Sequence, residues 1–273
     1  MPQYKKVFDI GTYTGNGGQY RVGMPTLRLP GPSAGAVANG LRFRQSNTNY
    51  LNRTASASAT NQYKFTYSCW VKFGRTAEAT TDYGELLNGY TASSDAGYGS
   101  LFFYNGNLRF GGWATNWRVT TQIFKDSSVW YHVVLAVDTT QATASNRILM
   151  YVNGVQITSF GTNNNPSQNS TVGINNNSTA SRIGLDAPAS SSRLLDGYLA
   201  ECNFIDGQAL TPSSFAEYNS DNIWVPKAFS GTYGANGFYL KFAPGAVGTD
   251  SSGNGNTWTL SGFNVTTANT TYD

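Results

Sequence analysis

FTYSCWVKF (Phe65–Phe73) is the stretch of sequence that decides the fold class. Every second side chain is apolar or aromatic and would share one face of a strand: Phe65, Tyr67, Cys69, Val71 and Phe73. A β-strand imposes this period of two, because successive side chains point to opposite faces of the sheet. We therefore predict a strand here, with this face in a hydrophobic core and Trp70 on the other face.

The same alternation of strand and turn continues along the chain. The nearly unbroken apolar run VWYHVVLAVD (Val129–Asp138) indicates a central strand that is covered on both faces. Asn-Gly pairs at 105–106 and 153–154 indicate tight hairpins, because both residues tolerate the positive φ of primed turns. Many short strands with regular turns predict a sandwich or barrel. The predicted core therefore gathers residues from several strands: Phe65, Tyr67, Val71, Val133, Leu135, Val152 and Phe204.

One short helix is predicted at TPSSFAEYNS (Thr211–Ser220), with Thr211 as its cap and Pro212 at its first helical position. The two cysteines, Cys69 and Cys202, both fall in predicted strands and are interpreted as buried free thiols. A disulfide between distant strands is the alternative. No Cys/His cluster has the spacing of a zinc site.

Composition excludes several classes of protein. Only 12% of the 273 residues are charged, about half the usual share, and the net charge is +3 without a run of Lys or Arg. No nucleic-acid partner is predicted, since such binding needs a clustered basic patch. No apolar run approaches the ~18 residues of a membrane span, so no membrane insertion is expected. The opening MPQYKKVFDI lacks the apolar core of a signal peptide.

Residues 1–40 differ from the rest and are interpreted as an extended N-terminal arm, with the sandwich over 41–273. Prolines at 25, 30 and 32 and many glycines prevent regular pairing and a core of its own. The arm nevertheless carries apolar side chains that need a surface to cover them: Tyr4, Val7, Phe8, Ile10, Tyr13 and Tyr20. We expect them to anchor the arm on a neighbouring subunit, in a homo-oligomer for which a trimer is the hypothesis. A disordered leader is the alternative.

An ordered set of segments resembles the laminin G-like, concanavalin A-like jelly rolls: FTYSCWVKF, WYHVVLAVD, ILMYVNGVQ and RIGLD followed by LDGYLAECNFIDGQAL. The stretches TPSSFAEYNSDNIWVPKAFSGTYGANGFYLKF and VGTDSSGNGNTWTLSGF resemble a subgroup found in tailed-bacteriophage virion proteins. The resemblance covers residues 41–265. It implies an all-β jelly-roll β-sandwich of two antiparallel sheets, but it does not fix a function, because this fold serves lectins, glycosidases, adhesion modules and structural parts.

No catalytic residue is predicted. Glycosidases of this fold use two carboxylates about 5–10 Å apart, whereas Glu201 and Asp206 would point to opposite faces of a straight strand. Asp82 and Glu85 are interpreted as solvated charges at the rim. The single histidine, His132, is expected to be buried and bonded to backbone, because nothing in the sequence arranges a Ser/His/Asp set around it. We therefore predict a non-enzymatic protein.

No metal or cofactor is expected either. DSSGNGN (Asp250–Asn256) begins with the spacing of a calcium loop, but Ser261 stands where such a loop needs a bidentate Glu. Calcium at Asp250 is the alternative.

A sugar site needs exposed aromatic rings flanked by polar side chains. GGWATNWRV (Gly111–Val119) supplies several of them near a turn, and two tyrosines flank a loop that could reach the same rim. The predicted glycan-binding residues are Trp113, Asn116, Trp117, Arg118, Tyr90 and Tyr98. The alternative is that one tryptophan belongs to the core and the other anchors an interface.

Two functions are compatible with these features. The first is a bacteriophage virion structural protein, made in the host cytoplasm: a capsid decoration protein or short head fibre whose arm clasps other virion proteins and which exposes a lectin-like domain on the virion surface. The second is a tail or fibre adhesin that binds a host-surface glycan. The single domain, without shaft repeats or heptads, favours the first.

Overall fold

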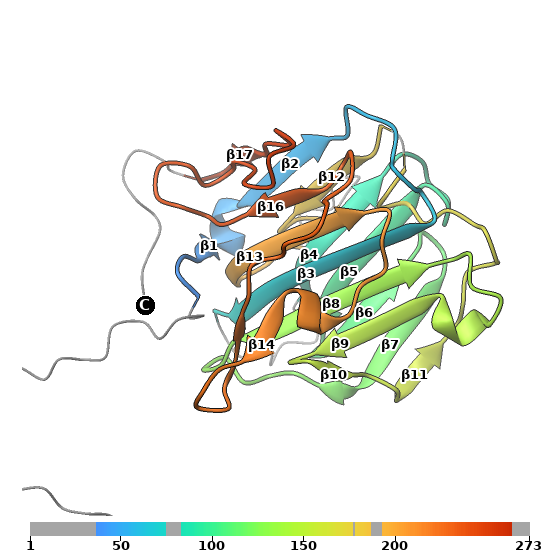
Figure 1. The fold of residues 1–273 in the computed structure, drawn as a ribbon, viewed down its shortest axis with the longest axis horizontal. Coiled ribbons are helices and arrows are strands. Elements are labelled where there is room, and N and C mark those ends of the chain that lie inside the picture. Colours follow the sequence, from blue (N-terminus) through green and yellow to red (C-terminus); the bar gives the residue numbers. More distant parts are fainter. Residues whose placement is uncertain (1–36, 75–82, 177, 187–192, 264–273) are drawn as a thin grey trace, which may run out of the picture. The chain divides into compact units, whose positions relative to one another are not determined.

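The computed structural model describes residues 37–74, 83–176, 178–186 and 193–263 (Figure 1). The seven-stranded sheet runs in the order β1 (Leu41–Phe43), β13 (Gly197–Asp206), β3 (Lys64–Phe73), β8 (Tyr131–Asp138), β9 (Ile148–Val152) and β10 (Val155–Gln156), with β16 (Phe238–Leu240) also paired to β13. The eight-stranded sheet runs β11 (Phe160–Asn163), β7 (Asn116–Ile123), β6 (Asn107–Gly111), β5 (Tyr98–Tyr104), β4 (Tyr83–Tyr90), β12 (Ala180–Ile183), β2 (Tyr50–Thr54) and β17 (Thr259–Ser261). All named pairings are antiparallel, so the predicted all-β jelly-roll sandwich is confirmed.

The core lies between the two sheets, as the alternation along β3 predicts. All seven residues of the predicted core are buried in one cluster. β8 is buried along its whole length, which confirms a central strand covered on both faces. Cys69 and Cys202 lie in the same core as free thiols, as predicted.

Two predicted hairpins are present. Asn105 and Gly106 join β5 to β6 with φ values of 51° and 78°, and Asn153 and Gly154 join β9 to β10 with 49° and 81°. These positive values are the geometry that the Asn-Gly pairs favour.

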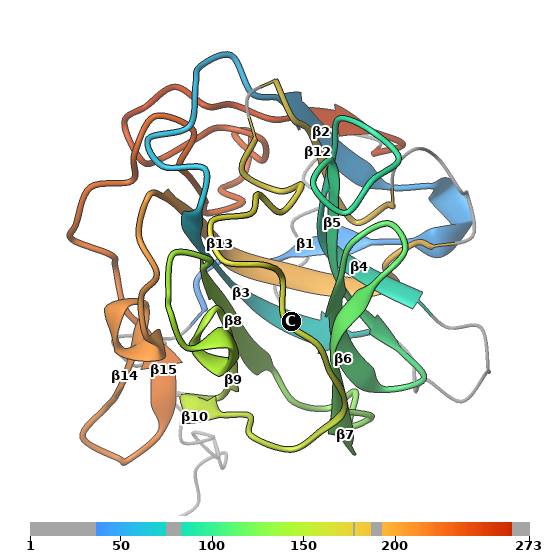
Figure 2. The ribbon, with the colours of Figure 1, turned by 90° about the vertical axis from the view of Figure 1, so that its right-hand side faces the viewer.

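The outer face of the seven-stranded sheet is covered by the C-terminal part of the chain. The hairpin of β14 (Ala216–Tyr218) and β15 (Trp224–Pro226) lies beside this sheet, on the side away from the eight-stranded sheet (Figure 2). Two smaller apolar clusters fill the space beneath it: Val134, Ala136, Tyr151, Ile205, Phe215 and Tyr233, and then Trp70, Ala200 and Ala216. Both faces of β3 and β8 are therefore shielded from solvent.

The predicted helix over Thr211–Ser220 is wrong. Only the 3-10 turn η3 (Pro212–Ser214) forms there, and β14 follows it directly. Pro212 occupies the first position, but the Thr211 side chain makes no capping bond. Phe215 and Ala216 are drawn into the clusters on the sheet, and this burial overrides the local helical pattern. Two further short 3-10 turns are η1 (Gln45–Asn47) and η2 (Ala144–Asn146).

Most of the predicted arm lies outside the described residues, including its apolar side chains Tyr4, Val7, Phe8, Ile10, Tyr13 and Tyr20. The last part of the arm is described. Val37 packs with Trp130 and Trp224 against the cluster around Trp70, so the apolar packing of the domain begins before Leu41.

His132 links the seven-stranded sheet to the β14–β15 hairpin. The indole Nε1–H of Trp224 donates to His132 Nδ1 at 3.1 Å, so Nδ1 is unprotonated and Nε2 carries the hydrogen. Nε2 lies 2.9 Å from Ser68 Oγ and must act as the donor there. The ring is fully buried as predicted, but it bonds two side chains instead of backbone. Because Nε2 already holds the proton, His132 cannot act as a base toward Ser68.

Burial lowers the pKa of His132 to about 3. In the unfolded chain its pKa is ~6.5, so the unfolded state binds more protons between these two pH values. This histidine's contribution to the free energy of unfolding is thus fully present above pH 6.5 and is lost as the pH falls toward 3, by up to ~1.4 kcal/mol per pH unit. Urea unfolding at pH 7, 6, 5 and 4 should show this slope, and His132→Phe should flatten it. Parallel profiles for the two proteins would contradict a buried neutral histidine.

Candidate functional site

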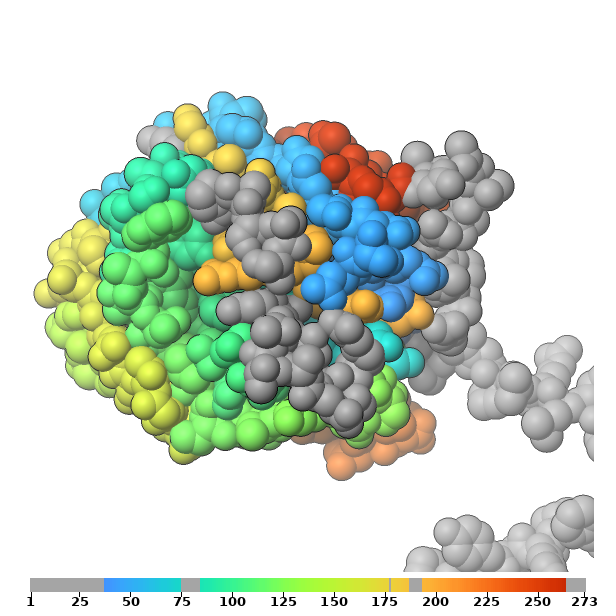
Figure 3. All heavy atoms as spheres, turned by 180° about the vertical axis from the view of Figure 1, so that it is seen from behind, coloured from blue at the N-terminus to red at the C-terminus, as the bar shows by residue number. Residues whose placement is uncertain are grey.

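The candidate site lies on the outer face of the eight-stranded sheet, where β4 and β5 run side by side. Leu101 and Phe103 of β5 point into the core, so Tyr98, Ser100 and Phe102 point outward. Figure 3 shows this side of the molecule, where the green and turquoise surface of the part of the chain around residues 83–125 lies beside the blue surface of the first described residues. These outward side chains combine two aromatic rings with hydroxyl groups, and all three are themselves buried.

An aromatic platform stands at the end of this face. Trp113, in the turn after β6, is 46% exposed. Its ring packs edge-on against Tyr98 with centroids 5.6 Å apart, and Tyr90 lies 6.3 Å away. Tyr90 and Tyr98 are direct cross-strand partners, so the sheet itself fixes their spacing. We call these three residues the Trp113 platform.

Asp95 holds the turn that presents Trp113. The backbone N–H of Ala114 donates to Asp95 Oδ1 at 2.8 Å. A Cβ at position 112 would lie 2.5 Å from the same oxygen, so a larger residue there would force the Asp95 side chain to move. The sequence offers one hint of this contact, the Gly-Gly pair before Trp113, but it predicts no role for Asp95.

A buried polar network supports the platform from below. The Tyr98 hydroxyl donates to Asp186 Oδ1 at 2.6 Å, and the Asn88 amide donates to the same oxygen at 3.2 Å. Arg193 pairs with Asp186 Oδ2 at 3.0 Å. Burial raises the pKa of Tyr98, and the nearby Glu85 and Asp186 carboxyl groups raise it further, so the phenol stays protonated and keeps donating. The Tyr98 ring is therefore held in place, and it supports the Trp113 ring that packs against it.

Glu85 lies deeper in the same network, and its interpretation as a solvated rim charge is wrong. Its side chain has no exposed surface, and Ser100 Oγ donates to its Oε1 at 2.8 Å. Burial raises the pKa of Glu85 well above its usual range, and the charge of Asp186 raises it further. Asp82, the other predicted rim charge, lies outside the described residues.

Two of the predicted glycan-binding residues lie inside the protein. Trp117 is 3% exposed and packs against Phe110 in the core. Arg118 is 2% exposed, and it donates to the Ile148 carbonyl at 3.3 Å and to Asn165 Oδ1 at 2.7 Å. Their burial excludes them from a surface site, because a ligand would have to displace the core to reach them. Trp117 is the core tryptophan of the alternative prediction.

The other predicted residues remain at the surface or directly beneath it. Trp113, Tyr90 and Tyr98 come together in the platform, and Asn116 is exposed at the start of β7. The network residues Glu85, Asn88, Asp186 and Arg193 were not predicted as a group, because β4 and the segment after β12 are far apart in the sequence.

Asp250 organises a turn. Its Oδ1 accepts the backbone N–H of Tyr239 at 2.9 Å and of Ser252 at 2.8 Å. Its Oδ2 accepts the Ser252 hydroxyl and the Asn256 N–H, both at 2.8 Å. Both oxygens are therefore engaged by donors. Among the residues that the structure describes, no three His, Cys, Asp or Glu side chains gather as metal ligands.

Glu201 and Asp206 lie on opposite sides of β13, as predicted, although the strand is not straight. A bulge at Glu201, with φ 49°, shifts the register against β3. Glu201 accepts a bond from the Tyr239 hydroxyl, whereas Asp206 accepts backbone N–H groups of Thr60 and Asn236. Within the described ranges, no helix is long and apolar enough to cross a membrane.

Comparison with known families identifies the fold. A family model described as the concanavalin A-like lectin/glucanases superfamily matches residues 45–216. The chain belongs to this superfamily. A search of curated protein sequences gives no significant match.

Solved structures with the same sandwich are distant in sequence. A protein from Bacteroides ovatus, described as a putative carbohydrate binding protein, is 18% identical with a TM-score of 0.52, over 81% of this chain and 58% of that one. A heptameric pentraxin from Limulus polyphemus is 15% identical with a TM-score of 0.47, over 70% and 93%. A Trypanosoma rangeli sialidase is 19% identical with a TM-score of 0.40, over 56% and 22%. These likenesses show the fold alone.

Substitution of the two tryptophans should lower the free energy of unfolding by very different amounts. Trp117→Ala removes a buried ring and should lower the free energy of unfolding by ~3–5 kcal/mol. Trp113→Ala should cost about 1 kcal/mol or less, because the ring is half exposed and makes few core contacts. Urea unfolding measures both values. Equal losses would mean that the two rings are not divided between core and surface.

Proposed function

We propose that the sandwich is a glycan-binding module that holds a sugar ring against the Trp113 platform. The observation that carries this proposal is the half-exposed Trp113 ring, fixed on Tyr98 and held in place by the contact of its turn with Asp95. The face of an indole attracts sugar C–H groups, and a fixed ring loses little conformational entropy on binding.

Polar groups suited to sugar hydroxyls occur in the two loops that carry the platform. Asn116, Ser93 and Ser94 are exposed, and Asp95 is half-buried beside the turn. Ser93 Oγ lies 3.3 Å from the Tyr90 hydroxyl. Amide, hydroxyl and carboxylate groups are the polar groups that orient sugars in binding sites. The superfamily and the name of the Bacteroides ovatus protein support the same reading.

Binding of bacterial-surface oligosaccharides, measured by glycan array and calorimetry, tests the proposal. Trp113→Ala should weaken binding at least ten-fold, and Trp113→Tyr should retain part of it, because a smaller aromatic face remains. Ile123→Ala is the matched control, since Ile123 is 55% exposed on the same sheet but away from the platform. If Trp113→Ala bound the glycan as tightly as the wild type, the proposal would be wrong.

We also propose that the module needs no metal and leaves its glycan intact. Asp186 is held by three neighbours and Glu85 has no exposed surface, so both acids support the platform instead of facing a substrate. Binding should therefore persist in chelator, and no reducing ends should appear. If the protein released reducing ends from the glycan, and Glu85→Gln abolished this release, the protein would be an enzyme.

The second candidate function concerns where the module acts. It is that of a capsid decoration protein or short head fibre on a bacteriophage virion. It rests on the resemblance of residues 211–242 and 247–263 to virion proteins and on the apolar side chains of the arm, residues 1–40. In this proposal the arm attaches the protein, as a homo-oligomer, to other virion proteins, and the sandwich faces outward on the virion surface. A tail or fibre position is the alternative.

A truncated chain that begins at Val37 tests the arm. It keeps the packing of Val37 with Trp130 and Trp224 and should fold with nearly unchanged melting temperature. It should bind glycan like the full chain but fail to join particles in an assembly assay. Full occupancy of particles by the truncated chain would show that the arm is not the anchor.

A further inference from the structure

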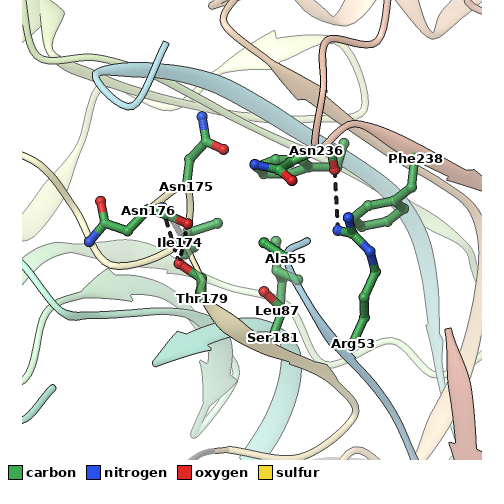
Figure 4. Close-up of a pocket in the computed structure, with 11 residues that line it drawn as sticks. Arg53, Ala55, Leu87, Ile174, Asn175, Asn176, Thr179, Ser181, Asn236 and Phe238 are labelled. Atoms are coloured by element: carbon green, nitrogen blue, oxygen red, sulfur yellow. Dashed lines mark hydrogen bonds between the residues drawn. The ribbon is translucent and has the colours of Figure 1, made fainter. Parts of the chain in front are cut away.

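The hollow at the rim between β2, β12 and the loops of Asn175 and Asn236 is too small for an organic ligand (Figure 4). It has room for about one water molecule. The Oδ1 atoms of both asparagines are themselves buried, so a molecule in the hollow does not reach them. The outer side of the seven-stranded sheet offers an open surface instead.

Exposed apolar side chains gather around the β14–β15 hairpin, which lies beside β10 (Figure 2). Tyr218 is 58% exposed, and Ile223, in the turn of the hairpin, is 57% exposed. Val155 of β10 is 66% exposed, and Val129, just before β8, is 41% exposed. Within the described ranges, these are four of the six most exposed large apolar side chains. Exposed apolar groups that gather in one place mark a surface that binds a partner.

Two tryptophans join these side chains into one face. Trp224 packs edge-on against Tyr218, its cross-strand partner, with ring centroids 4.9 Å apart. A Cβ on Gly154 would lie 3.1 Å from the Trp224 ring, so this ring rests on the turn that leads into Val155. Trp130 and Trp224 are half-buried and pack against the same small cluster beneath the hairpin. We call the following residues the hairpin face: Trp130, Val155, Tyr218, Ile223 and Trp224.

Polar groups at the hairpin face are bonded within the protein. The indole N–H of Trp224 donates to His132 Nδ1 at 3.1 Å. In the turn, Asn219 Oδ1 accepts the backbone N–H of Asp221 at 3.0 Å and of Ile223 at 2.9 Å. A sugar site needs polar groups that are available to hydroxyls. The hairpin face therefore suits the apolar side chains of a polypeptide better than a sugar.

The arm joins the sandwich at this face. Val37 packs against the same cluster as Trp130 and Trp224, and a Cβ on Gly40 would lie 3.3 Å from the Trp130 ring. Residues 1–36, which precede this junction, carry the apolar side chains that need a surface to cover them: Tyr4, Val7, Phe8, Ile10, Tyr13 and Tyr20.

The charges of the arm and of the hairpin are complementary. Residues 1–36 contain four basic side chains and one acidic side chain, so the chain's whole net charge of +3 lies in this segment. The hairpin and its turn expose Glu217 and Asp221, whereas Lys227 beside them pairs with Glu217 at 3.6 Å. The excess of negative charge at the hairpin attracts the basic arm, which speeds association and favours this partner over others.

The spacing along the arm favours a second copy over the same chain as its binding site. Sixteen residues lie between Tyr20 and Val37, with prolines at 25, 30 and 32. A proline-rich segment extends by ~3.1 Å per residue, so this one spans up to ~50 Å. A domain of this size has a radius of gyration of roughly 18 Å. The segment is thus long enough for the apolar side chains of the arm to reach a neighbouring sandwich.

We propose that the hairpin face of one copy binds the apolar side chains of residues 4–20 of a second copy. The proposal rests on the proposed role of the arm in a homo-oligomer, and it names the surface that the arm binds. Each copy offers one arm and one face, so the contact joins two unlike surfaces, as in a ring of identical subunits.

Sedimentation velocity over a series of protein concentrations tests the proposal with two chains that each lack one partner. The chain that begins at Val37 keeps the hairpin face but has no arm. The full chain with Tyr218→Ser and Ile223→Ser keeps the arm but loses the face. Each should be monomeric alone, whereas the wild-type full chain forms an oligomer. When mixed, the two should form a dimer with one chain of each kind, because the arm of one binds the face of the other.

Ile123→Ser is the matched control, since Ile123 is 55% exposed on the eight-stranded sheet, and it should associate like the wild type. Val155→Lys changes the face outside the hairpin and should raise the dissociation constant at least ten-fold. It replaces the double variant if melting curves show that the double variant does not fold. Glycan binding should be unchanged in all these variants, because Trp113 belongs to the other sheet.

A full chain that is monomeric at every concentration, a double variant that associates like the wild type, or a mixture without a dimer would each overturn the proposal. If the chain that begins at Val37 fails to join particles and the mixture forms no dimer, the arm binds another virion protein and the hairpin face is not its site. If the mixture forms the dimer but the chain that begins at Val37 joins particles at full occupancy, the arm links copies of this chain without anchoring them.

Discussion

The structure depends on keeping both faces of β3 and β8 out of water. Their inner face is covered by the eight-stranded sheet, and the outer face, with Val134 and Ala136, is apolar as well. An open sheet with such an outer face would expose a large apolar patch. The chain after β13 therefore turns back across it, and the bond between Trp224 and His132 fixes the β14–β15 hairpin there. The sandwich is in effect three layers at this place.

This constraint leaves the outer face of the eight-stranded sheet and the rims for function. Strands β4 and β5 set the spacing of Tyr90 and Tyr98, and the buried bond from Tyr98 to Asp186 holds that ring. Trp113, at the tip of a tight turn, therefore packs against a ring that is held in place. Asp206 at the end of β13 acts in a similar way, since its carboxylate accepts the Asn175 amide and the backbone N–H of Asn236 and so holds two loops. In both places a buried carboxylate joins parts of the chain that are far apart in the sequence.

Local patterns were sufficient to predict much of the fold. The period of two in β3, the apolar run of β8 and the Asn-Gly hairpins each depend on neighbouring residues only. The helix expected at Thr211 failed because Phe215 and Ala216 are recruited by a sheet far away in the sequence. Glu85 was misjudged for a similar reason, since burial raises its pKa and the charge of Asp186, which lies beyond β12, raises it further. The site was half predictable. The sequence placed two tryptophans near one turn, but only the fold shows that Trp117, in β7, points into the core whereas Trp113 stays in the exposed turn.

The most direct test of the account is the indole N–H spectrum of the ¹⁵N-labelled protein during titration with a bound glycan, assigned through Trp113→Phe and Trp117→Phe. The account predicts that the Trp113 signal shifts and saturates with the glycan, while the signals of the buried Trp117 and Trp258 stay in place. A glycan that binds but leaves the Trp113 signal unmoved would contradict the assignment of the binding site.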